Sequence, residues 1–239
     1  MKSAWRRLRS LRDSGAGLGS ALAAALLLGA AAPAQADQGV LSYYLGVRAI
    51  GGYAMVDDVQ TSGFTGTSQI QNDSDVVGGV GVYAGTKHRD WPVRFELEVA
   101  HRFRMDFDVR ENRAGAVIDH EMNIATTSAL VSAIVEWRNA TRFTPFLGAS
   151  LGWARNATDT ERINLATQTK TERSEDRDNL AWGAMVGVDW DFSESWTAQA
   201  AYRYVDLGEV GSGAGPSGES ISADSHTAHE LLLGILYRF

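Results

Sequence analysis

The chain contains no cysteine, which excludes a disulfide framework and a thiolate metal site. After residue 36 it also lacks any apolar run close to the ~18 residues that a transmembrane helix requires. No amphipathic helical pattern is convincing in that part of the chain. Stability must therefore come from burial or from lipid. Hydropathy does not decide between the two, because a membrane β-barrel shows only alternation, a weak pattern in each segment.

An excess of positive charge is absent as well. The 22 basic side chains stand against 29 acidic ones, a formal net charge of −7. Residues 1–36 hold five of the basic residues and one acid, so 17 basic and 28 acidic side chains remain without them, or −11. Such an acidic chain is a poor candidate for nucleic-acid binding or for a basic membrane-surface patch.

The long apolar stretch that the chain does contain lies near its N-terminus. Basic residues come first, residues 18–32 (LGSALAAALLLGAAA) are apolar, and residues 34–36 (AQA) form a small-x-small cleavage motif. This order predicts a cleaved secretory signal peptide over residues 1–36, with a retained membrane anchor as the alternative. The mature chain, residues 37–239, is then expected to form one domain.

Residues of alternating polarity recur in eight segments, as in β-strands. The segments are 43–55, 75–86, 93–105, 124–137, 143–155, 180–192, 196–208 and 228–239. Short links (KHRDW, RNATR and DFSES) follow the second, fourth and sixth segments. Longer polar stretches follow the others, at 57–74, 106–117, 158–178 and 209–225. This pattern predicts an all-β fold: an eight-stranded antiparallel up-and-down transmembrane β-barrel, with short turns in the periplasm and long loops outside.

The less apolar face of these segments indicates where the apolar face points. Glycine, alanine and serine dominate it in 75–86, 143–155 and 180–192, whereas a sheet facing water would favour Lys, Glu, Thr and Gln. Small residues suit the narrow lumen of an eight-stranded barrel. Long side chains of both signs share this face, and buried charges persist when they are paired. The predicted lumen charge network consists of Arg48, Arg94, Glu96, Glu98, Arg102, Arg104, Glu136, Asp189, Arg203, Glu230 and Arg238.

Aromatic residues gather toward the segment ends on the apolar face, as they do in the interfacial girdles of membrane barrels. They are Tyr43, Tyr53, Trp137, Trp153, Trp182, Trp190, Tyr202, Tyr204, Tyr237 and Phe239. The apolar face is therefore predicted to meet lipid, which places Leu231, Leu233 and Ile235 on the outside. Because lipid tolerates no open sheet edge, the eighth segment is expected to pair with the first.

Three features carry a resemblance to a known family: the signal peptide, YRYVDLGEV at 202–210, and HELLLGILYRF at 229–239 with its last aromatic residue. The mature chain resembles the small outer-membrane β-barrel proteins of Gram-negative bacteria, of the OmpA-transmembrane and opacity-porin type. The resemblance implies a place in the outer membrane and a role in envelope integrity, surface exposure or minor pore activity. We expect outer-membrane lipid and lipopolysaccharide as partners. The resemblance also implies that Tyr237 and Phe239 form an assembly signal read by the barrel-assembly machinery.

Two groupings of histidines and carboxylates invite a catalytic or metal-binding interpretation. His226, His229 and Glu230 read as H-x-x-H-E, but on a strand the two histidines point to opposite faces. Asp119-His120-Glu121 lies near the predicted outer rim, where catalysis would need further carboxylates from other strands. His101 lies on the apolar face without the serine that lipid A deacylases carry two residues along.

The acidic stretch TERSEDRDN could bind Ca²⁺ weakly, although such charge runs are ordinarily solvated surface. We therefore predict no catalytic residue, no metal site and no cofactor. The leading hypothesis is a non-enzymatic barrel with a structural or envelope-integrity role, or one whose external loops meet an extracellular ligand that the sequence does not name. A narrow pore for small polar solutes is the alternative, and a lipid-modifying enzyme is the third hypothesis.

Overall fold

The computed structural model describes residues 40–63, 67–72, 74–113, 116–164, 169–213, 218 and 220–239. The predicted signal peptide, residues 1–36, lies outside the described residues. Within them there is no helix of the length and hydrophobicity that would let it span a membrane.

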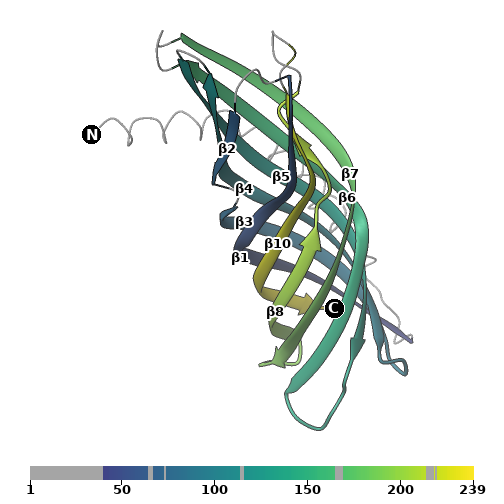
Figure 1. Cartoon of the computed structure of the whole chain (residues 1–239). Helices are drawn as coiled ribbons and strands as arrows, with labels where there is room; N and C mark the ends of the chain where they lie inside the picture. Colours follow the sequence, from purple (N-terminus) through teal and green to yellow (C-terminus); the bar gives the residue numbers. More distant parts are fainter. Residues whose placement is uncertain are drawn as a thin grey trace. The chain divides into compact units, whose positions relative to one another are not determined.

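Eight long antiparallel strands form a closed ring (Figure 1). They are β1 (Leu41–Ser62), β3 (Ser74–His88), β4 (Val93–Arg113), β5 (Ala116–Glu136), β6 (Phe143–Asn164), β7 (Thr169–Asp191), β8 (Trp196–Asp206) and β10 (Ser220–Arg238). Two short strands, β2 (Thr67–Asn72) and β9 (Val210–Gly211), pair with β4 and β10. The predicted eight-stranded antiparallel barrel is thus confirmed.

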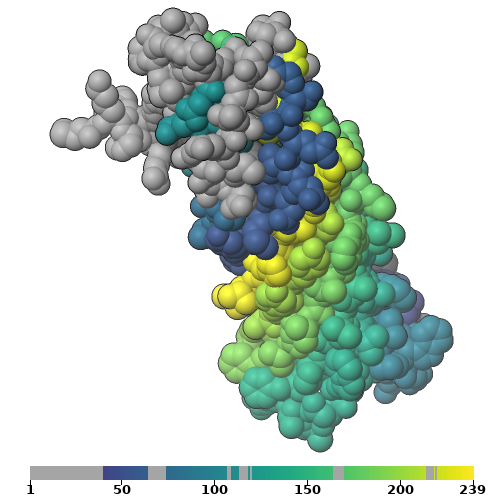
Figure 2. All heavy atoms as spheres, viewed as in Figure 1, coloured from purple at the N-terminus to yellow at the C-terminus, as the bar shows by residue number. Residues whose placement is uncertain are grey.

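The ring closes between the last strand and the first. Tyr44 of β1 lies opposite Arg238 of β10, and the pairing continues to Ser62 opposite Ser220. Figure 2 shows the side chains of β10 running between those of β1 and β8 on one face of the molecule. Since each strand of the ring has two neighbours along this stretch, its backbone groups are satisfied as lipid requires.

The two ends of the barrel differ. At one end, here called the turn end, short connections follow β3, β5 and β7, and both Val40 and Phe239 lie there. At the other end, the extension end, β4 to β7 continue eight or more residues past the segments that alternate in sequence. The stretches 106–117 and 158–178, predicted as loops, are mostly strand in the structure. Alternation disappears from them because both faces carry polar residues, so hydropathy did not reveal them.

Along the central part of the barrel the outer face is apolar. Leu231 and Leu233 are 65% and 66% exposed, and Leu147 and Leu151 behave likewise. This apolar belt, here called the lipid-facing band, is bordered by exposed aromatic residues on both sides. Toward the turn end these are Tyr43, Trp137, Phe143, Trp190, Trp196, Tyr237 and Phe239. Toward the extension end they are Tyr53, Phe103, Trp153, Trp182 and Tyr202.

A β-bulge in β4 shifts the alternation of that strand. Arg102 lies opposite Thr126, but the next aligned pair is Met105 opposite Ile124, so two residues of β4 face one of β5. Arg104 therefore points outward, where its Nη2 lies 2.5 Å from Asp159 Oδ2, and Met105 is buried. The sequence-based placement of Arg104 in the lumen is corrected here, because a bulge changes which residues face inward beyond it.

Candidate functional site

The lumen within the lipid-facing band holds a line of alternating charges that is here called the charged layer. Its six side chains come from four strands, are all at most 3% exposed, and are three acids and three bases, so their formal charges cancel. In spatial order they are Glu96, Arg48, Glu98, Arg203, Glu230 and Arg102.

Each link in the charged layer is a close ion pair. Arg48 lies 2.9 Å from Glu96 and 2.8 Å from Glu98. Arg203 bridges Glu98 and Glu230, each at 2.7 Å, and Arg102 Nε donates to Glu230 Oε1 at 2.5 Å. Taking such charges out of water is costly unless each is paired, and here every charge has an opposite neighbour.

Aromatic side chains support this layer on the turn-end side. The Arg48 guanidinium lies 3.8 Å from the centre of the Tyr83 ring, a cation–π contact. The Tyr44 hydroxyl donates to Glu96 at 2.9 Å. Tyr44 and Tyr83 are themselves buried and pack edge to face, so they fill space that the small residues Gly46 and Gly85 leave open.

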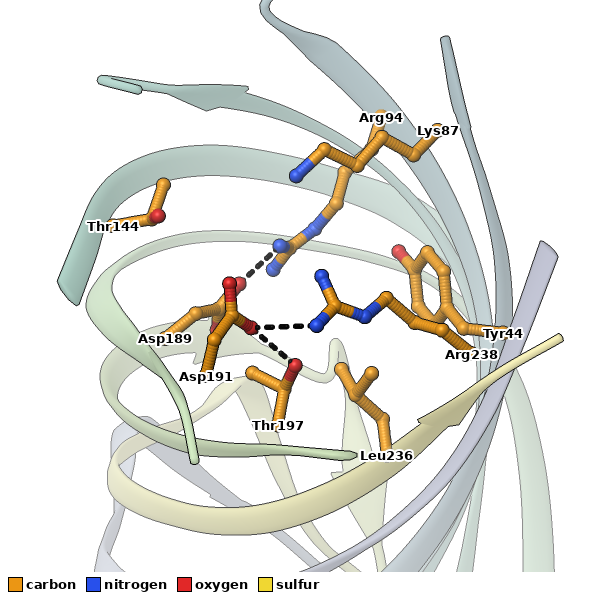
Figure 3. Close-up of a pocket in the computed structure, with 9 residues that line it drawn as sticks. All are labelled: Tyr44, Lys87, Arg94, Thr144, Asp189, Asp191, Thr197, Leu236 and Arg238. Atoms are coloured by element: carbon orange, nitrogen blue, oxygen red, sulfur yellow. Dashed lines mark hydrogen bonds and ion pairs between the residues drawn. The ribbon is translucent and has the colours of Figure 1, made fainter. Parts of the chain in front are cut away.

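A second group of charges lies closer to the turn end, around a recess lined by Tyr44, Lys87, Arg94, Thr144, Asp189, Asp191, Thr197, Leu236 and Arg238. Figure 3 shows Arg94 reaching toward Asp189 and Arg238 toward Asp191. Arg94 also pairs with Glu136 at 2.8 Å, and Lys87 lies 2.6 Å from the same carboxylate. The recess is thus polar and internally paired.

Beyond the charged layer, toward the extension end, the interior changes character. On β8 the next inward-facing residue after Arg203 is Val205. On β10 the inward-facing neighbour of Glu230 on this side is Ala228. From there the lumen is filled by buried apolar side chains, here called the apolar layer. Its members are Ala54, Val56, Val77, Met105, Val109, Met122, Ile124, Leu130, Ala154, Ala181, Val205, Leu207, Val210, Ile221, Ala223 and Ala228.

The segment 207–213, which follows β8, contributes to the apolar layer. Its backbone pairs with β10, since Leu207 N–H donates to His226 O at 2.8 Å. The Asn156 side chain on β6 donates to the carbonyls of Leu207 and Glu209, each at 3.0 Å. Leu207 and Val210 are thereby held inside the barrel. Part of the predicted outer loop 209–225 therefore lies within the lumen.

The predicted lumen residues can now be placed. Nine of the eleven are buried inside the barrel: Arg48, Arg94, Glu96, Glu98, Arg102, Glu136, Asp189, Arg203 and Glu230. Arg238 lines the recess at the turn end with its side chain 27% exposed, and Arg104 lies outside. Lys87, Asp191 and Arg138 join the ion pairs although sequence reasoning omitted them. Lys87 was assigned to a turn, and Asp191 shares the alternation of Asp189, which would have identified it.

The remaining candidate groupings do not converge. His226 is buried inside the barrel, whereas His229 points outward and its Nδ1 lies 2.5 Å from the Tyr202 hydroxyl. His101 contacts Thr127 Oγ1 at 2.9 Å on the outer face, and His120 lies 3.7 Å from Glu111 inside. Among the described residues, no three His, Cys, Asp or Glu side chains are grouped so that they could hold a metal ion.

Comparisons with known proteins agree with this architecture. The family model described as the outer membrane protein beta-barrel domain matches residues 22–239. Outer membrane protein PagN of Salmonella typhimurium (strain LT2) is 27% identical over 157 residues, which cover 62% of this chain. The match covers 66% of PagN, slightly less than two thirds of that relative's length.

A solved structure of low sequence identity shares the fold. The outer membrane protein OprG from Pseudomonas aeruginosa superposes with a TM-score of 0.50 at 15% identity, covering 84% of this chain and 98% of OprG. Neisserial surface protein A gives a TM-score of 0.46 at 16% identity, covering 82% of this chain and 97% of that structure. The chain belongs to the outer membrane protein β-barrel family, and it is a protein of the Gram-negative outer membrane.

Proposed function

We propose that this protein is a non-enzymatic, non-conducting barrel that anchors a rigid β-extension at the cell surface for interaction with extracellular molecules. The observation that carries the proposal is the filling of the lumen at two successive levels, the charged layer and the apolar layer. A barrel closed in this way offers its outer surface, and not a passage, to its surroundings.

Both levels oppose the passage of ions and small solutes. In the charged layer Arg102 and Arg203 are 1% exposed and paired with Glu230, so moving them aside would leave buried charges without partners. Beyond it, the apolar layer fills the lumen with packed side chains such as Met105, Met122 and Leu207, each at most 1% exposed, which opposes the entry of water. The alternative, a narrow pore for small polar solutes, would require both levels to open together.

The extension is suited to surface contact because it is polar outside and held together by ion pairs. On β6 and β7 Arg155 lies 2.6 Å from Asp176, and Lys170 pairs with Glu161. The hydrogen bond from Arg155 to Asp176 raises the pKa of the Arg155 guanidinium. We infer that this end faces outward from the cell and that the lipid-facing band meets outer-membrane lipid, with lipopolysaccharide at its outer edge.

Conductance and lipid chemistry test the proposal together. The purified protein, inserted into planar bilayers beside a channel-forming porin as positive control, should give no stable steps of current. Overexpression in cells should leave the composition of lipid A unchanged. Reproducible channels would contradict the closed lumen, and a new lipid A species would contradict the non-enzymatic role.

We also infer that the C-terminal aromatic pair is recognised by the barrel-assembly machinery. Phe239 is 61% exposed and packs edge to face against Tyr237, with ring centres 5.3 Å apart, at the turn end. Deletion of Phe239 should reduce the amount of folded protein in the outer membrane. Because folded barrels migrate differently on gels before and after heating, that assay measures the loss, and normal insertion of the shortened chain would refute it.

A further inference from the structure

Strand β7 has a hydrogen-bonding edge that no described strand occupies beyond the lipid-facing band. On one side β6 pairs with β7 along nearly its whole length, from Thr169 to Trp190. On the other side β8 pairs with it only from Trp182 to Asp191, because β8 ends at Asp206. Figure 1 shows β7 continuing past the end of β8. Among the strands that the structure describes, residues 169–181 therefore have a partner on one side alone.

The backbone groups that face this edge follow from the register. Asp191 N–H donates to Arg142 O at 2.9 Å, on the side of β6. Successive residues of a strand direct their backbone groups to alternate sides, and β6 and β7 pair without a register shift. Odd-numbered residues of β7 thus bond to β6, and even-numbered residues present N–H and C=O to the open edge. Those residues are Lys170, Glu172, Ser174, Asp176, Asp178 and Leu180, all with exposed side chains.

The nearby segment 207–213 does not fill the edge. It touches β7 through side chains that point inward: Asn179 donates to Glu209 O at 2.9 Å, and Arg177 lies 3.2 Å from the Glu209 carboxylate. The backbone hydrogen bonds described for it go to β10, as the bond from Ser212 N–H to Ile221 O shows, and no described backbone bond joins it to β7. The inner face of β7 is therefore covered while the backbone groups of its even residues are left for another strand.

We propose that this edge binds an extended segment of a partner protein by strand addition, and that the segment carries basic residues at alternate positions. The free stretch of 13 residues is about 40 Å long at strand spacing, enough for a peptide of ten or more residues. Strand addition takes its affinity from main-chain hydrogen bonds and its specificity from alternate side chains. The inference rests on the proposed surface-interaction role and names the class of partner.

The charges of the even-numbered residues 170–180, whose side chains lie on the outer face of β7, explain why a basic partner segment is proposed. Two charged members of this set already pair with β6: Lys170 with Glu161, and Asp176 with Arg155. Glu172 and Asp178 add two negative charges beside them. Lysine or arginine directly opposite these acids stabilises a strand pair, and like charges there destabilise it. A second copy of β7 paired about Ser174 would place Glu172 opposite Asp176, an unfavourable contact that a basic strand avoids. The same charges protect the exposed edge from indiscriminate aggregation, so an acidic edge selects a basic strand.

Amide hydrogen exchange measured residue by residue tests whether the edge is open. In the folded protein in lipid nanodiscs, the N–H groups of residues 172, 174, 176 and 178 should exchange at least tenfold faster than those of 171, 173, 175 and 177. Adding an 11-residue synthetic peptide of alternating lysine and threonine should slow the even-numbered set alone. Equal protection of both sets without peptide would overturn the proposal.

Ser174 offers a matched pair of variants for the binding measurement. Ser174→Pro and Ser174→Ala both remove the hydrogen bond from Ser174 Oγ to Asp159 Oδ1, but only proline removes an N–H from the open edge. The alanine variant should bind the lysine–threonine peptide within about twofold of the wild type, and the proline variant at least tenfold more weakly. A peptide with glutamate in place of lysine should not bind.

Each outcome separates this inference from the function proposed above. Unchanged peptide affinity in Ser174→Pro, or self-association of the protein in place of peptide binding, would refute strand addition by a basic segment. The bilayer experiment would still report on the closed lumen. If Ser174→Pro does not fold, as heat-modifiable migration on gels would reveal, the exchange pattern of the wild-type protein decides the matter alone.

Discussion

The barrel in the lipid-facing band and the extension beyond it are built from the same strands but have opposite interiors. In the band, Leu231 and Leu233 face lipid while Glu230 and Arg203 lie inside. In the extension, the outer face carries ion pairs such as Arg155 with Asp176, while side chains such as Ile124 fill the interior. In the band the polar side chains lie inside, whereas in the extension the outer face is polar and the interior combines apolar side chains with buried polar ones such as Asn156 and His226.

This reversal follows the surroundings of the wall. In the band, lipid demands an apolar exterior, and the narrow interior then accepts polar side chains because each charge finds a partner. In the extension, water outside makes an apolar interior favourable, as in a soluble barrel. The protein thus stacks a soluble barrel on a membrane barrel. The two layers should respond differently to substitution, which the following experiments exploit.

The largest effect is expected in the charged layer. Glu230→Ala removes the carboxylate shared by Arg102 and Arg203 and leaves two guanidinium groups in the lumen, one of them without a close acid. Breaking a buried pair in this way costs about 3–5 kcal/mol. Urea unfolding of the protein in lipid vesicles measures the loss in the free energy of unfolding. Glu209→Ala, which affects an exposed ion pair with Arg177, serves as a control that should change it by less than about 1 kcal/mol.

A double variant tests whether charge balance is the reason. Arg102→Met with Glu230→Leu removes one base and one acid, and Glu98 still pairs with both Arg48 and Arg203. Replacing a buried pair by apolar residues of similar volume is often close to neutral, so the double variant should recover most of the stability lost in Glu230→Ala. If the stability losses of the single variants Arg102→Met and Glu230→Leu simply add in the double variant, packing and not charge pairing dominates this layer.

An intermediate effect is expected in the apolar layer. Ile124→Ala opens a cavity around a side chain that is 1% exposed, and such truncations cost about 2–4 kcal/mol. The same urea experiment measures it, with the exposed Thr171→Ala as a control that should change stability by less than about 0.5 kcal/mol. A loss below 1 kcal/mol for Ile124→Ala would mean that the extension is not packed as a soluble core.

The same contrast explains how far sequence reasoning reached. Within the band one face meets lipid, so strands such as 93–105 alternate clearly and the ring of eight was predictable. In the extension both faces hold polar residues: Arg155 and Asp176 lie outside, and Asn156 and Arg177 inside. Periodicity therefore vanished there, and the strands were taken for loops. Their pairing depends on cross-strand contacts that no single segment reveals.

The charged layer was easier to anticipate than its geometry. Charges of both signs on one face suggested pairing, yet the partners lie far apart in sequence: Arg102 meets Glu230, and Arg203 meets Glu98. Those pairs follow from strand order and register across a closed barrel. Arg104 was misplaced for a different reason. A single extra residue in β4 inverts the alternation of inward and outward side chains beyond it, and an assignment by sequence periodicity does not detect such a bulge.

The bulge provides the smallest effect and the sharpest test of where the two regions meet. Deleting Arg104 should leave Phe103 opposite Ala125 and keep Met105 opposite Ile124, so no inward residue changes its face. What is lost is a half-exposed ion pair with Asp159, which contributes about 0–1 kcal/mol. Val99 lies earlier in β4, where the pairing with β5 is regular. Deleting it should exchange the inward and outward side chains of β4 on one side of the deletion and prevent folding, because a one-residue slip exchanges the two faces of a strand. Heat-modifiable migration on gels and urea unfolding distinguish the two variants. If both deletions prevented folding, the bulge would be essential to the barrel and not merely the place where β4 redirects its side chains.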